Sequence, residues 1–255
     1  MNHIVRLLAL ALVTPWVLGV IADGSDQERY AQAPDDDPGW ENVGRRGATS
    51  AVYLGRGWVL TARHSLVGDV AFGESVHLPV GGTMVWLDDP SGAKADLILF
   101  RIEPVPDLPP LRIRRRAPPP RSKVMLVGFG PQRGEPHEWN GISGFRYLGG
   151  GTRHWGMNTF SSRQIDLPGP HDTITRCLQL AFMGNGVDDA VAGTGDSGGA
   201  VFVRGPKAWR LGGVMLAVAK HAAQPDSLAL FGNITHAADV SAYARQILEV
   251  TGLEP

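Results

Sequence analysis

The sequence contains one cysteine among 255 residues, so no disulfide can form within a chain. It also carries little charge: Asp, Glu, Lys and Arg make up 19% of the residues, against roughly 25% in an average globular chain. Positive and negative charges nearly cancel at a formal net charge of −1, so the chain lacks the field that would concentrate nucleic acid. These shortages exclude a disulfide scaffold, and they argue against a disordered chain and a nucleic-acid partner.

Long hydrophobic runs are also scarce. One uncharged run, from Leu7 to Ala22, follows a basic start, and Pro15 interrupts it. It is shorter than the roughly 20 residues that a spanning helix needs. We therefore expect residues 1–22 to be a signal peptide that is cleaved before Asp23, which implies a secreted or periplasmic protein with no stable membrane association. The polar residues 23–39 are expected to form an N-terminal linker.

Glycine and proline are abundant, at 33 and 19 residues, and they separate short apolar runs that are typical of strands. Such runs are predicted at 50–54, 58–62, 83–87, 97–102, 123–127, 178–182, 200–204 and 211–218. A helical period occurs only near the end, between Asp239 as a possible N-cap and Gly252 as a stop. The Pro- and Arg-rich stretch 112–122 divides the chain into two β units, about 40–111 and 123–255. Cys177 lies in an apolar stretch and is expected to be a buried small hydrophobe.

The glycine-rich segment from Gly193 to Gly199 fits three sequence patterns. A dinucleotide-binding loop must open a helix, but a short apolar strand follows here. The nucleophile elbow of α/β-hydrolases, with Asp226 and His236 completing a triad, also needs a following helix and repeated strand–helix units. That arrangement would make the chain an esterase on another fold, and it is disfavoured. The third pattern, Gly-Asp-Ser-Gly-Gly between strands, requires a base and an acid earlier in the chain.

Both requirements are met in order. His64 ends the apolar run Trp-Val-Leu-Thr-Ala-Arg-His, and Asp96 begins the run Asp-Leu-Ile-Leu-Phe. Together with the Gly-Phe-Gly turn at 128–130, these segments resemble the trypsin/chymotrypsin-like serine peptidases from about Trp40 to the end of the chain. The resemblance implies an all-β fold of two antiparallel six-stranded β-barrels (chymotrypsin-like) with a C-terminal α-helix, in a peptidase domain that spans 40–255.

The resemblance also implies catalytic roles. Ser197 would be the nucleophile, His64 its general base, and Asp96 the carboxylate that orients the imidazole. The backbone N–H groups of Gly195 and Ser197 would form the oxyanion hole. Asp196 is expected to have a structural role, paired with a buried cation or amine.

The sequence departs from the family at two places. We find no Ile-Val-Gly-Gly type segment for activation by a new N-terminus, so an internal arginine is the expected substitute. The specificity pocket is expected at Val191, six positions before the nucleophile, and at Leu216, Ala217 and Val218. None of these four residues is charged, so an apolar pocket is predicted.

The sequence thus predicts a secreted serine endopeptidase that acts on protein or peptide substrates through an acyl-enzyme, without a metal or other cofactor, and as a monomer. The alternative is a catalytically silent trypsin-like protein that binds peptides or partners. Measured turnover would separate the two.

Overall fold

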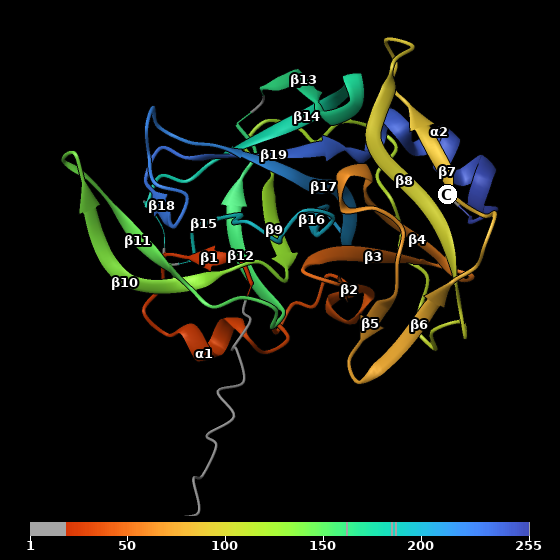
Figure 1. Cartoon of the computed structure of the whole chain (residues 1–255), viewed down its shortest axis with the longest axis horizontal. Helices are drawn as coiled ribbons and strands as arrows, with labels where there is room; N and C mark the ends of the chain where they lie inside the picture. The colour runs from red at the N-terminus through yellow and green to blue at the C-terminus, as the bar shows by residue number, and fades with distance from the viewer. Residues whose placement is uncertain (1–18, 162, 185, 187, 255) are drawn as a thin grey trace, which may run out of the picture.

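A computed structural model describes residues 19–161, 163–184, 186 and 188–254, and Figure 1 shows its strands in two groups lying side by side. Strands hold 48% of the residues that the structure describes. The first sheet contains β2 (Val43–Arg46), β3 (Thr49–Gly55), β4 (Trp58–Ala62), β5 (Val70–Phe72), β6 (Ser75–Pro79), β7 (Val85–Asp88) and β8 (Lys94–Glu103). The second contains β9 (Lys123–Gly128), β12 (His154–Thr159), β13 (Gln164–Gly169), β14 (Thr173–Ala181), β16 (Ala200–Arg204), β17 (Trp209–Ala219) and β19 (Ile234–Asp239).

The first sheet closes into a six-stranded barrel, because β4 pairs with both β3 and β8. The seventh strand, β7, is added outside the closure on β8. Successive side chains of a strand point to opposite faces, so β8 supplies two apolar clusters. Ile98 and Phe100 belong to a cluster with residues of the first sheet only, whereas Leu97 and Leu99 join the large core shared with the second sheet. Both faces of β8 are therefore buried, which explains its continuous apolar run.

The second sheet is barrel-like, with the strand order β12-β9-β16-β17-β19-β14-β13. The side chain of Asn158 in β12 spans the remaining edge. Its amide donates to the carbonyl oxygens of Ala181 (3.1 Å) and Ala190 (2.8 Å). The expected all-β fold of two antiparallel barrels is confirmed.

The predicted C-terminal helix is also confirmed, as α2 (Val240–Thr251). The Asp239 carboxylate accepts a hydrogen bond from the Ser241 N–H, and Gly252 ends the helix in the left-handed region, at φ 63°. Tyr243 is fully buried and donates at 2.7 Å to the carboxylate of Asp89, which directly follows β7 of the first sheet. The helix therefore fastens the two sheets together.

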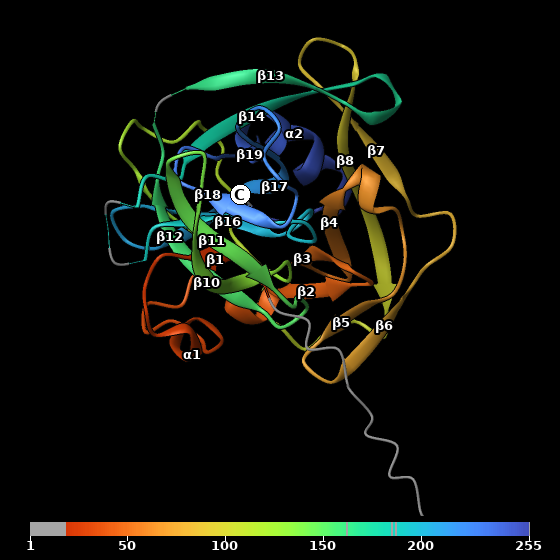
Figure 2. The same cartoon turned by 60° about the vertical axis from the view of Figure 1, so that its left-hand side comes forward.

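A hairpin that the apolar pattern missed projects from the second sheet. It consists of β10 (Gln132–Trp139) and β11 (Ile142–Leu148), with β18 (Leu228–Leu230) paired to β11. Figure 2 shows this hairpin coming forward. Much of β10 is exposed on both faces, so its sequence is polar and lacks a strand-like run. The signal that identifies the hairpin is Asn140-Gly141, both at positive φ, in its two-residue turn.

The N-terminal segment packs on the second sheet, whereas a polar linker was expected there. β1 (Ile21–Ala22) pairs with β15 (Ala190–Val191), and a short helix, α1 (Gln27–Tyr30), follows. Tyr30 is 1% exposed, stacks edge-on against Trp155, and donates to the Asp188 carboxylate at 2.6 Å. The buried Tyr30 is one of the contacts that hold this segment, and composition averaged over the segment conceals it.

Most of the expected signal peptide lies outside the described residues. Within the part of the chain that the structure describes, no helix is long and apolar enough to cross a membrane. The described ranges also hold three single-turn 3₁₀ helices, at Trp40–Asn42, Arg63–Ser65 and Pro170–Asp172.

Candidate active site

His64 and Asp96 meet because their strands are neighbours. β4 and β8 pair antiparallel with Ala62 opposite Leu97, so the turn after β4 lies beside the start of β8. The Asp96 carboxylate accepts two hydrogen bonds, from His64 Nδ1 at 2.6 Å and from the His64 backbone N–H at 2.8 Å. Asp96 is 5% exposed. Both the ring and the backbone of the histidine are therefore fixed by one buried carboxylate.

A residue of the second sheet holds Asp96 from behind. The backbone N–H of Asp96 donates to Thr175 Oγ1 in β14 at 2.8 Å, and Thr175 is 1% exposed. The carboxylate thus sits at the seam between the two sheets. Nothing in the local sequence marks Thr175, since its role depends on how β14 packs against β8.

The Gly193–Gly199 segment forms a tight loop around a fully buried carboxylate. Asp196 accepts hydrogen bonds from the backbone N–H groups of Gly193 (2.7 Å), Gly130 (2.8 Å) and Val20 (3.4 Å). No salt bridge reaches it from the described part of the chain, so neither an arginine nor another side-chain cation fills the expected role. Burial raises the pKa of Asp196 to about 6.

Glycine is required at two places in this loop. Gly195 has φ 104°, and a Cβ atom there would lie 2.8 Å from the Ala48 carbonyl oxygen. Gly198 has φ 86°, and its Cβ would clash with the Ser50 carbonyl. The resulting turn leaves the backbone N–H groups of Gly195 and Ser197 without acceptors among the residues described.

Ser197 and His64 line one cavity of about 460 Å³. The Ser197 hydroxyl donates to the Leu216 carbonyl oxygen at 3.3 Å, and in the described structure no hydrogen bond joins it to His64. Leu216, Ala217 and Val218, which the sequence assigned to the specificity pocket, form part of the wall of this cavity.

Val191 does not line this cavity, although the sequence placed it in the pocket. It is fully buried in β15 and packs in an apolar cluster with Ile21, and the next residue, Ala192, reaches the cavity instead. The cavity also has a polar part that the sequence did not indicate. Tyr147 from β11, together with Lys220 and Asp226 from the segment after β17, lines it.

The N-terminal segment enters the fold behind the serine loop. Val20, Ile21 and Ala22 are each 0% exposed, and the Gly19 N–H donates to His154 Nδ1 at 3.2 Å. Val20 has φ 38°, a strained left-handed conformation for a β-branched residue. This burial was not expected, because the sequence assigns residues 1–22 to a signal peptide that is cleaved before Asp23.

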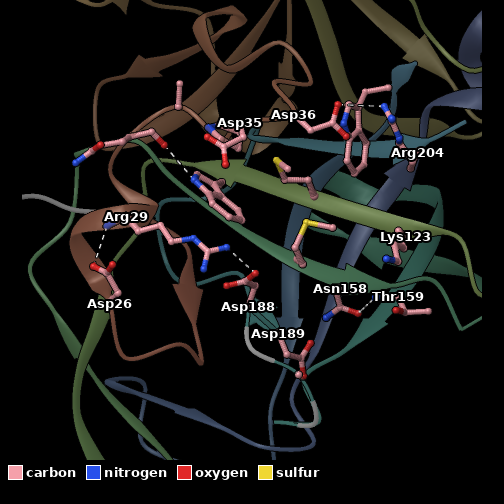
Figure 3. A pocket seen from close by; sticks show the side chains of 18 of the residues that line it. Asp26, Arg29, Asp35, Asp36, Lys123, Asn158, Thr159, Asp188, Asp189 and Arg204 are labelled. Atoms are coloured by element: carbon pink, nitrogen blue, oxygen red, sulfur yellow. Dashed lines mark hydrogen bonds and ion pairs between the residues drawn. The ribbon is translucent and has the colours of Figure 1, made fainter. Parts of the chain in front are cut away.

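A second, larger cavity of about 1050 Å³ lies beneath the N-terminal segment (Figure 3). Its walls include Trp155, Met157 and Trp209, and ion pairs join Arg29 to Asp188 and Arg204 to Asp36 at its rim; none of the candidate catalytic residues lines it. Its lining also includes Glu28, Asp35 and Lys123, for which the described structure records no ion pair.

Comparison with solved structures identifies the fold. An inactive form of Rv3671c from Mycobacterium tuberculosis, carrying a serine-to-alanine mutation, matches with a TM-score of 0.54 at 16% identity, over 88% of this chain and 98% of that one. The active form of the Rv3671c protease matches with a TM-score of 0.51 at 17% identity, over 81% of this chain and 74% of that one. The HtrA-type protease AlgW, solved with a decapeptide, matches with a TM-score of 0.51 at 17% identity, over 80% of this chain and 52% of that one.

No family model matches the sequence, and no curated protein matches it. At these identities the structural likeness concerns the fold. The chain has the trypsin/chymotrypsin-like serine protease fold.

Proposed function

We propose that this chain is a serine endopeptidase that hydrolyses peptide bonds through an acyl-enzyme on Ser197. The observation that carries the proposal is the pair of hydrogen bonds from His64 to the Asp96 carboxylate, on the wall of the cavity that contains Ser197. The likeness to proteases in fold supports it, and the decapeptide in the AlgW structure supports a peptide as the ligand class.

His64 would act as the general base. The Asp96 contact at Nδ1 fixes the tautomer that leaves Nε2 as the proton acceptor, and it stabilises the imidazolium formed when Ser197 attacks the carbonyl carbon. His64 then gives this proton to the leaving amine, which departs and leaves an acyl ester on Ser197. In the second half, water attacks the ester, with His64 again taking and returning a proton.

The oxyanion of each tetrahedral intermediate would be bound by the free N–H groups of Gly195 and Ser197. Such donors are worth on the order of 3 kcal/mol each, because they are already oriented where the charge develops. The buried Asp196 keeps them oriented by accepting hydrogen bonds from the N–H groups of Gly193, at the start of the loop, and of Gly130, in the 128–130 turn.

We include in this proposal that the active form begins at Val20. Cleavage of the Gly19–Val20 bond would release the strained φ of Val20 and convert its amide N–H, 3.4 Å from Asp196, into an ammonium group. That group would supply the cation that the buried carboxylate lacks in the described chain. Cleavage before Asp23, as the sequence suggested, would remove β1 from the fold.

One observation favours the catalytically silent alternative. The Ser197 hydroxyl donates to the Leu216 carbonyl and not to His64. Catalytic hydrogen bonds are often loose without substrate, and a rotation about χ1 would redirect this hydroxyl, so the peptidase remains the better account.

The proposal is tested by incubating the 20–255 chain with an unfolded, alkylated protein and identifying the products by mass spectrometry. We expect internal cleavages that are absent with Ser197→Ala, provided that circular dichroism shows both chains equally folded. Absence of cleavage by the folded 20–255 chain, together with retained peptide binding, would support the silent binding protein.

A further inference from the structure

The cavity at Ser197 is apolar along Leu216, Ala217 and Val218, but one part of it is charged. The Lys220 ammonium lines it and donates to the Asp226 carboxylate at 2.9 Å and to the Asp226 carbonyl at 3.2 Å. Lys220 follows β17 directly, so the strand that forms the apolar wall also carries the cation. A side chain that enters beside Ser197 would therefore pass an apolar wall before it meets this charge.

The two members of the ion pair differ sharply in exposure. The Lys220 side chain is 20% exposed, whereas that of Asp226 is fully exposed. The Lys220 ammonium also lies 5.8 Å from the centre of the Tyr147 ring. Lys220 is thus held against the protein, while Asp226 reaches it from water. An ion pair with such an exposed partner contributes little to stability, so another carboxylate readily replaces that of Asp226.

Tyr147 adds a second donor to the same part of the cavity. Burial raises the pKa of its hydroxyl, as do the Asp196 and Asp226 carboxylates, so the phenol keeps its proton at every working pH. The hydroxyl makes no hydrogen bond to the residues described here. Among the described residues, the cavity wall holds one titratable residue besides Tyr147, Lys220 and Asp226, namely His64 at the catalytic end.

We propose that Lys220, assisted by the Tyr147 hydroxyl, selects substrates with an acidic side chain, glutamate above all, next to the bond that is cut. The inference rests on the proposed function and names its substrate class. The substrate carboxylate would replace that of Asp226 on the ammonium, and Asp226 would turn into solvent. The aliphatic part of the substrate's acidic side chain would lie against Leu216, Ala217 and Val218.

A basic side chain fits this cavity less well. It would meet the partly buried Lys220 ammonium before it could pair with Asp226, whose full exposure weakens any ion pair it makes. An uncharged side chain would leave the Lys220–Asp226 pair intact and gain only the contact with the apolar wall.

The test uses the 20–255 chain and four peptides that differ only at the residue before the scissile bond: Glu, Gln, Leu and Lys. We expect kcat/KM for the Glu peptide to exceed that for the Gln peptide by about tenfold or more, because the ammonium pairs only with a carboxylate. Lys220→Met should lower the Glu-to-Leu ratio by about tenfold, and Asp226→Asn should raise it. The matched control is Lys207→Met, at an exposed lysine in the turn between β16 and β17, which should leave the ratio unchanged.

Preference for Leu or Lys over Glu, or a Lys220→Met variant with an unchanged ratio, would overturn the inference while leaving a working peptidase. If the chain shows no turnover, a binding measurement tests the proposed acidic site instead. Fluorescently labelled Glu and Gln peptide amides are titrated onto Ser197→Ala and onto the Ser197→Ala, Lys220→Met double variant. Tighter Glu binding that the double variant loses supports the acidic site, and equal binding of the two peptides contradicts it.

Discussion

The backbone nitrogen of Val20 lies 3.4 Å from Oδ1 of Asp196, although 176 residues separate the two in the sequence. Asp196 precedes the candidate nucleophile and accepts hydrogen bonds from the N–H groups of Gly193 in its own loop and of Gly130 in the 128–130 turn. The start of the folded chain is thereby connected to the shape of the candidate oxyanion site.

A chain that begins at Val20 should be more stable than one that begins at Asp23. Val20, Ile21 and Ala22 are fully buried, and fully burying one Val or Ile side chain contributes about 1.5–3 kcal/mol. Chemical denaturation of the 20–255 and 23–255 chains should show a difference of several kcal/mol, with weaker hydrolysis by the shorter chain. Equal unfolding free energies would mean that β1 does not contribute.

The stability of a chain that retains Gly19 should fall as the pH rises from about 4 to 6. Burial raises the pKa of Asp196 from 3.8 to about 6, so over this window the folded state holds a proton that the unfolded state releases. The loss is at most roughly 3 kcal/mol, and it should be absent from Asp196→Asn. Denaturation midpoints at several pH values measure how stability changes with pH in the chain that retains Gly19 and in its Asp196→Asn variant. In the 20–255 chain the new ammonium should lower this pKa and reduce the loss.

Asp96→Asn should leave the fold intact and lower kcat by about 10⁴, the scale seen when a serine protease loses this carboxylate. The amide cannot stabilise the imidazolium and favours the wrong tautomer of His64. Asp89→Asn serves as a comparison, since Asp89 bonds Tyr243 and not the histidine, so its effect should fall on stability. Similar kcat values for the two variants would remove Asp96 from the mechanism.

Thr175→Val should reduce both stability and kcat. The exchange preserves shape but leaves the buried Asp96 N–H without its acceptor, at about 1–3 kcal/mol, and loosens the carboxylate beneath His64. Thr175→Ser restores the hydroxyl and should recover most of kcat. If the serine variant behaves like the valine variant, the methyl contact and not the hydrogen bond is what matters.

Local patterns in the sequence were enough to predict the strands near the site. The runs before His64 and after Asp96 are continuous apolar segments because both faces of β4 and β8 are covered, and this leaves a clear signal. Gly195 and Gly198 mark a turn that only glycine tolerates, which sets the Ser197 loop apart from its neighbours. The terminal helix shows its period and both caps.

Other parts depend on contacts between distant segments, which a single sequence does not display. Thr175 reaches Asp96 only because strands of the two sheets pack together. Val20 reaches Asp196 only because the N-terminal segment passes behind the serine loop. The exposed β10 has no apolar face, and Tyr30 is the single fully buried residue of α1. In the sequence, nothing distinguishes Lys220 from an ordinary surface lysine. In the fold, β17 and β11 place it beside Tyr147.

The central claim is that His64 and Asp96 activate Ser197. Intact-mass measurement of the 20–255 chain after treatment with a fluorophosphonate probe, beside Ser197→Ala and Asp96→Asn, tests it directly because the probe reacts only with an activated serine. The account predicts one adduct on the wild-type chain, none on Ser197→Ala, and far slower labelling of Asp96→Asn. A folded wild-type chain that stays unlabelled, or an adduct that persists in Ser197→Ala, would contradict it.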